Sequence, residues 1–164
     1  MADHRWSLLC YRGVIDKYSN MLSLLDVTDE ISLEPIPEPL PESVGLPINL
    51  HLVSMWMRSD LEIPESLWSG IKIVTPIGTE FVTGEPLAVD LAAHPRIRLV
   101  FRFQIIPFQG AGIYRFVVGC SETRDGEQAP VAFVPLEVKI QEPISSTEPE
   151  QLSEPIPSAL PEST

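Results

Sequence analysis

The sequence predicts an all-β fold, a sandwich or barrel of seven or eight antiparallel strands. Apolar and polar residues alternate with period two in most segments that carry the hydrophobic residues. Turn residues separate these segments about every 8–15 residues. Helical signals are confined to Asp60–Gly70, which is short and contains Pro64, so we expect a loop with one helical turn there.

The expected strands follow in order along the chain. Two of them, 6–15 and 21–27, flank the turn residues Asp16–Asn20. The others are expected at 47–57, 71–75, 80–83, 96–106, 113–120 and 130–140. Alternation is clearest in 96–106, with Ile97, Leu99, Phe101, Phe103 and Ile105 inward and Arg96, Arg98, Arg102 and Gln104 outward.

The last two expected strands narrow the architecture. The inward residues are Tyr114, Phe116, Val118 and Cys120 in one strand and Val134, Leu136, Val138 and Ile140 in the other. Tyr114 follows a glycine-rich turn, and in immunoglobulin-like sandwiches a tyrosine at this point of the penultimate strand bonds backward to fix a corner. An ordinary core tyrosine is the alternative. Phe116 stands where antibody domains carry a cysteine, so the expected immunoglobulin-like β-sandwich has no disulfide between its sheets.

Two runs also carry a family resemblance. They are Asn20–Ile31, with the sequence NMLSLLDVTDEI, and the strand that begins Gly-x-Tyr-x-Phe-x-Val at Gly112. In them the chain resembles, over about residues 5–140, a family of small bacterial proteins known only as a domain of unknown function. The resemblance implies an immunoglobulin-like β-sandwich and supplies no catalytic residues.

The length and charge predict one domain with two acidic segments. The 164 residues fit a single core, expected at 4–141. Ten of the 17 prolines lie in the loop 34–47 and in the C-terminal segment 142–164. Without 142–164 the formal charge of -12 falls to -7, and without 34–43 as well it falls to -4. This composition predicts disorder or polyproline-II structure, so we expect a disordered acidic C-terminal tail.

The two acidic segments resemble each other at eight of ten positions, 34–43 against 154–163. They are either duplicated solvated linkers or short ligands with isoleucine and leucine anchors on an extended backbone. A third interpretation is that the tail and the loop compete for one groove on their own domain.

Charge and cysteine usage predict the compartment and exclude some partners. The net charge argues against duplex DNA or an anionic membrane surface as the main partner. No secretory leader and no membrane-spanning apolar run is expected. Cys10 and Cys120 are too few for a disulfide scaffold, so we expect buried thiols in a cytoplasmic protein.

The sequence shows no catalytic constellation. His4, His51 and His94 are far apart and lack the close spacing of zinc ligands. No nucleophile elbow or phosphate-binding loop is present. We therefore expect no catalytic residue, metal or cofactor. The acidic groups Asp26/Asp29/Glu30 and Asp60/Glu62 keep a hydrolase with a cross-strand His/Asp site as the third hypothesis.

Arginines supply one candidate interaction surface. If 96–106 and 113–120 pair as a hairpin, Arg98, Arg102 and Arg115 form a cationic stripe that suits an acidic partner. The plainer interpretation is a solvated sheet face with scattered ion pairs. If the two strands belong to opposite sheets, as at an immunoglobulin corner, the stripe breaks up.

Methionines and tryptophans supply the other candidate surface. Alternation cannot place Met55, Trp56 and Met57 on one buried face, and Trp68 follows close by. These residues are either an exposed protein-binding surface or part of a sheet buried on both faces. We therefore expect a non-catalytic protein-interaction or assembly module with a protein partner. The alternative is a β-sandwich that binds a small ligand or a carbohydrate through exposed aromatic residues. The oligomeric state is left open.

Overall fold

The computed structural model describes residues 2–35 and 44–141, which form nine strands. These are β1 (Asp3–Ile15), β2 (Leu22–Val27), β3 (Glu30–Leu33), β4 (Val44–Met57), β5 (Ser66–Val74), β6 (Glu80–Asp90), β7 (Arg96–Phe108), β8 (Gly112–Ser121) and β9 (Ala129–Ile140). The expected disorder of 142–164 and most of the proline-rich loop lie outside the described residues. Within the described part, no helix is long and apolar enough to cross a membrane.

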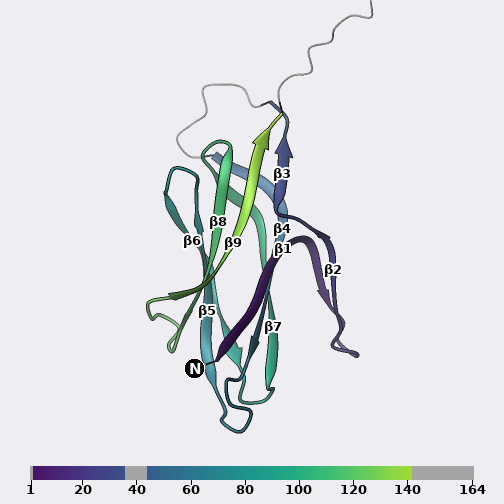
Figure 1. Cartoon of the computed structure of the whole chain (residues 1–164), viewed down its shortest axis with the longest axis vertical. Coiled ribbons are helices and arrows are strands. Elements are labelled where there is room, and N and C mark those ends of the chain that lie inside the picture. The colour runs from purple at the N-terminus through teal and green to yellow at the C-terminus, as the bar shows by residue number, and fades with distance from the viewer. Residues whose placement is uncertain (1, 36–43, 142–164) are drawn as a thin grey trace, which may run out of the picture.

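The strands build two sheets that face each other, as Figure 1 shows. Sheet A has the order β2-β1-β4-β7, and sheet B has the order β3-β9-β8-β5-β6. Inward side chains of both sheets share one hydrophobic core, where Phe103 of β7 and Phe116 of β8 meet edge to face at 5.4 Å. The prediction of an all-β sandwich is confirmed.

Some predicted elements differ from the observed ones. Nine strands replace the expected seven or eight, because β3 is only four residues long and carries little alternation of its own. β3 pairs with β9 in parallel, so the sheets are not wholly antiparallel. The loop expected within Asp60–Gly70 extends only to Glu65: the Ile63 N–H donates to the Asp60 carbonyl over 3.3 Å in a single turn, and β5 begins at Ser66.

Two residues predicted to face the core do not. Ile105 is 64% exposed, and the following Ile106 is fully buried instead. A β-bulge explains the change of phase, because β4 carries an extra residue between Pro47 and Leu50 opposite this part of β7. At the end of β9, Ile140 is also exposed, whereas Val134, Leu136 and Val138 are buried as predicted.

The outer face of sheet A is covered by the hairpin of β1 and β2. Figure 1 shows β1 bending over near its label and the hairpin descending at the right of the view. The Gly13 N–H donates to Nδ1 of His51 on β4 over 2.9 Å, and a Cβ at Gly13 would lie 2.9 Å from Val53 Cγ2. His51 and Val53 are therefore buried although they face away from the core, so the middle of β4 is buried on both faces.

The connection from β7 to β8 crosses between the sheets at a tyrosine corner. The hydroxyl of Tyr114 donates to the carbonyl of Gly110 over 2.8 Å and accepts from the N–H of Gln109 over 2.9 Å. Tyr114 is fully buried, and burial raises the pKa of its hydroxyl. The predicted corner is confirmed.

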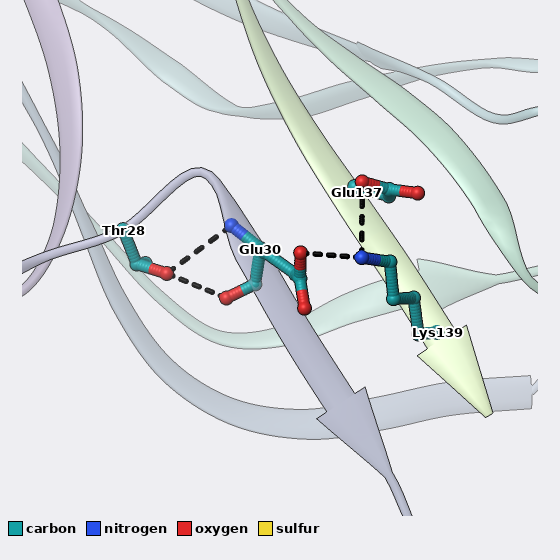
Figure 2. A network of polar contacts seen from close by, with 4 residues as sticks. All are labelled: Thr28, Glu30, Glu137 and Lys139. Atoms are coloured by element: carbon teal, nitrogen blue, oxygen red, sulfur yellow. Dashed lines mark hydrogen bonds and ion pairs between the residues drawn. The ribbon is translucent and has the colours of Figure 1, made fainter. Parts of the chain in front are cut away.

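A second crossing, from β2 to β3, is held at the surface (Figure 2). Thr28 Oγ1 donates to the carbonyl of Glu30 over 2.6 Å, and Glu30 Oε2 accepts from Nζ of Lys139 over 2.5 Å. Glu137 lies 3.5 Å from the same amine. The bond to Glu30 and the charges of both glutamates raise the pKa of Lys139. These contacts fix β3 along the end of β9.

Candidate functional site: the outer groove of sheet B

The three arginines predicted as a stripe are split between the sheets. Arg98 and Arg102 lie on β7 in sheet A, and Arg115 lies on β8 in sheet B. β7 pairs with β4, and β8 pairs with β5 and β9, so the hairpin on which the stripe depended does not exist. The alternative, in which consecutive strands belong to opposite sheets, is confirmed.

Arg98 has a structural contact. Its guanidinium donates to the carbonyl of Asn20 over 3.1 Å, which ties the tip of the β1–β2 hairpin to β7. Asn20 adopts a left-handed φ of 53°, a conformation that asparagine tolerates in tight turns. Arg98 therefore anchors the cover of sheet A.

The methionine and tryptophan cluster is mostly enclosed. Trp56 is 0% exposed; its Nε1 donates to Ser54 Oγ over 3.1 Å, and its ring meets His4 edge to face at 5.1 Å. Its expected place on an exposed surface is wrong, because Trp56 faces the core between the sheets. Met55 and Met57 point to the opposite side of β4 and are half-buried. The other interpretation, a strand buried on both faces, holds in the middle of β4, where Val53 and Ser54 are both buried on opposite faces.

Trp68 lies on the outer face of sheet B, half-buried beneath Arg124. The guanidinium carbon of Arg124 is 5.8 Å from the centre of a Trp68 ring, and the same guanidinium pairs with the carboxylate of Glu85. Glu85 belongs to a bulge in β6, opposite Gly70. This contact closes one end of a groove on sheet B.

We define the outer groove of sheet B by the residues that line it. It measures about 790 Å³ and lies over β5, β6, β8 and β9. Val82 pairs with Lys72, Lys72 with Val117, and Val117 with Phe133, so these four form one row across four strands. Val82 is 80% exposed and Phe133 is 62% exposed. Further lining residues are Gly70, Ile71, Val74, Gly78, Glu80, Gly84, Pro86, Arg115, Gly119, Arg124, Asp125, Gly126, Glu127, Gln128 and Pro130.

A glycine pair forms part of the floor. Gly70 of β5 lies opposite Gly119 of β8. Gln128 packs over both: its Oε1 accepts from the Gly70 N–H over 3.1 Å, and its Nε2 donates to Ser121 Oγ over 2.8 Å. A Cβ at Gly119 would lie 2.8 Å from the Cβ of Gln128, so both the glycine and the folded-back loop are needed.

The charges of the groove leave Arg115 without a partner. Lys72 pairs with Glu80 over 2.8 Å, and Arg124 pairs with Glu85. The residues opposite Arg115 are Val74 and Pro135, and no hydrogen bond or ion pair joins the side chain of Arg115 to another residue of the described ranges. The groove thus combines an apolar row with the unpaired guanidinium of Arg115, and the acidic lining residues Asp125 and Glu127 lie in the loop before β9.

The sequence carried a signal for this groove that alternation alone did not reveal. Val117 and Phe133 occupy the outward phase of strands whose inward phase is already apolar. Apolar residues in the outward phase are the signal for a second contact surface.

The histidines and acidic groups considered for catalysis lie apart. His51 has Cys10 and Arg102 as its cross-strand neighbours, and His4 Nε2 bonds with Ser7 Oγ over 2.7 Å. Burial lowers the pKa of His4. Asp26 and Asp29 are exposed at the surface. Over residues 2–35 and 44–141, no three His, Cys, Asp or Glu side chains lie close enough to hold a metal ion.

Comparisons with known proteins do not assign this chain to a family. No protein-family model matches the chain, and no curated protein sequence matches it. The resemblance to the bacterial family stays a prediction.

Proposed function

We propose that this chain is a non-catalytic protein-interaction module whose binding surface is the outer groove of sheet B. The observation that supports this proposal is the row of Val82, Val117 and Phe133, which presents apolar side chains to solvent beside the unpaired Arg115. Exposed apolar surface rimmed by polar groups is typical of protein contacts, and arginine is enriched in them.

The energetics favour a macromolecular partner. Complete burial of an exposed valine or phenylalanine contributes about 1.5–3 kcal/mol per side chain. Val82 and Phe133 lie at opposite ends of a row that crosses four strands. One ligand must extend across that row to cover both, which suits a polypeptide segment better than a small molecule.

The carbohydrate alternative has less support. Sugar binding of the kind expected from the sequence needs an open aromatic face, and Arg124 lies against Trp68. Phe133 is the only aromatic residue among those that line the described groove. The β1–β2 hairpin exposes apolar residues too, namely Met21, Leu25 and Val27, but none of them lines this groove.

The proposal is tested by photo-cross-linking in cells that make the full chain. A benzophenone amino acid replaces Phe133 in one variant and the fully exposed Tyr18 of the hairpin tip in the control. We expect protein adducts from position 133 that position 18 does not give. Identical adducts from both positions, or only carbohydrate adducts at 133, would contradict the proposal.

Two charge-reversal variants make the test more specific. Arg115→Glu in the benzophenone variant should lower the adduct yield about tenfold, because it reverses the charge beside the apolar row. Lys17→Glu is the matched control, since Lys17 is exposed in the turn between β1 and β2 and lines neither groove. Equal losses from both substitutions would count against a site on sheet B.

A further inference from the structure

The sandwich is open on the side where β6 and β7 lie. β7 is the last strand of sheet A, β6 is the last strand of sheet B, and no backbone hydrogen bond among the described residues joins them. The opposite side differs, because its terminal strands β2 and β3 follow each other in the chain and β3 is clamped to β9. An unpaired strand exposes backbone N–H and C=O groups that can pair with another chain.

β7 is the better template of the two edge strands. β6 is interrupted by the bulge at Gly84, Glu85 and Pro86, where three residues lie opposite Gly70. β7 runs for 13 residues, and among the described strands only β4 pairs with it, along one edge. The hairpin tip contacts β7 at Arg98, so the stretch beyond it, Val100–Pro107, is the open part.

A second groove runs along this open part. Its volume is about 660 Å³, which lies within the usual range of ligand-binding pockets. Phe101 and Phe103 of β7 line it together with Phe81 and Leu87 of β6. The space between the edges is therefore apolar on its inner side and suits apolar side chains of an added strand.

The outer side of β7 is cationic. Arg96, Arg98 and Arg102 share this side, and the β4 residues opposite them are Met57, Met55 and His51. None of these β4 residues is acidic. The side chain of Arg102 has no hydrogen bond or ion pair with another residue of the described ranges. A strand added to the free edge would supply the missing negative charge on this side.

The same arginines disfavour a second copy of this chain as the occupant. A second copy of β7 contains no acidic residue that could face Arg96, Arg98 or Arg102, and it would bring three more arginines to a side that is already cationic. Proline lacks the N–H that a ladder needs, which disfavours ligands with proline at every second or third position.

We propose that β7 accepts an extended strand of a partner protein at Val100–Pro107, and that this strand alternates apolar residues with aspartate or glutamate. The apolar residues enter the groove against Phe101 and Phe103, the acidic residues face Arg102, and the backbone continues sheet A. This is β-strand addition, and it is independent of the outer groove of sheet B.

The test uses a synthetic octapeptide of alternating valine and glutamate, added to the isotope-labelled full chain. We expect slower amide exchange in Val100–Pro107 when the peptide is bound. A peptide with lysine in place of glutamate and a peptide N-methylated at alternate residues should each bind about tenfold more weakly or worse. These two controls change the ligand only, so folding of the protein does not affect the comparison.

A charge reversal completes the test. Arg102→Glu should reverse the preference between the glutamate and lysine peptides, whereas Leu61→Ser should leave it unchanged because Leu61 is exposed in the loop before β5 and lines neither groove. The proposal is overturned if no peptide binds, if the N-methylated peptide binds equally well, if protection falls outside β7, or if Arg102→Glu leaves the preference intact.

Discussion

The outer faces of the two sheets differ in what covers them. On sheet A the β1–β2 hairpin folds over β4, and the outward residues His51 and Val53 are buried. On sheet B the loop that carries Arg124 and Gln128 covers Trp68 and the glycine pair, and Val82 and Phe133 are exposed. Outward-facing apolar residues therefore differ in role between the sheets. On sheet A they pack beneath the β1–β2 hairpin, and on sheet B they are exposed and form the binding surface that we propose.

Gly13 allows the β1–β2 hairpin to pack closely on the outer face of sheet A. A side chain there would collide with Val53, whereas the bare backbone approaches closely enough to bond with His51. Arg98 holds the far end of the same hairpin through Asn20. The contacts of Gly13 with His51 and of Arg98 with Asn20 together hold the β1–β2 hairpin against the outer face of sheet A.

The largest effect is expected from introducing one charge on each outer face. Val53→Asp should lower the free energy of unfolding by about 3 kcal/mol or more, because it buries a carboxylate without a partner. Val82→Asp, its matched control on sheet B, should change it by less than about 0.5 kcal/mol. Denaturant unfolding measures both, and similar losses would show that the two faces do not differ.

The corner between the sheets comes next. Tyr114→Phe should cost about 1–3 kcal/mol, because Gln109 and Gly110 lose a buried hydrogen-bonding partner. Tyr18→Phe is the control, since Tyr18 is fully exposed. Equal stability of the two variants in denaturant would refute the role of the corner.

Tyr114 also predicts how alkali acts on the fold. Its pKa is raised by burial in the folded state, so its contribution is complete below the unfolded value of 10.0 and is lost as the pH rises through the folded pKa. Unfolding midpoints measured on either side of pH 10 should fall more in the wild type than in Tyr114→Phe. A loss of the same size in both would assign it to other groups, such as the buried thiols of Cys10 and Cys120, whose pKa values burial also raises.

Acid should weaken the protein through sheet A. The pKa of His4 is lowered by burial, so its contribution is present above the unfolded value of 6.5 and is lost as the pH falls below it. His4→Phe keeps a ring beside Trp56 but cannot titrate. Its unfolding midpoint should decline less than that of the wild type between pH 7 and pH 5, and an equal decline would exclude His4 as the cause.

The smallest effect is expected at the anchor of the hairpin. Arg98→Met should speed amide exchange in the hairpin, including the Gly13 N–H, with little change in global unfolding. Arg96→Met on the same side of β7 is the control. If both substitutions leave exchange in the hairpin unchanged, the bond to Asn20 does not hold the cover.

Several site residues could not be placed from the sequence. Alternation left open whether Trp56 or its neighbours Met55 and Met57 are exposed; Trp56 faces the core, and the two methionines point to the other side of β4. The phase of Ile105 depends on an extra residue in β4, which is distant in the chain. β3 exists through its pairing with β9, not through any pattern in its own four residues.

The position of Tyr114 after a glycine-rich turn predicted the tyrosine corner. Alternation by itself determined the all-β class, the inward residues of β8 and most of those of β9. Those features follow from the pleat of a single strand, which sends successive side chains to opposite faces. Only the tertiary structure decided that β7 and β8 belong to different sheets, that the hairpin covers sheet A, and that the groove of sheet B is open. Strand pairing and packing between distant segments set these features, and a strand's own sequence does not specify its partner.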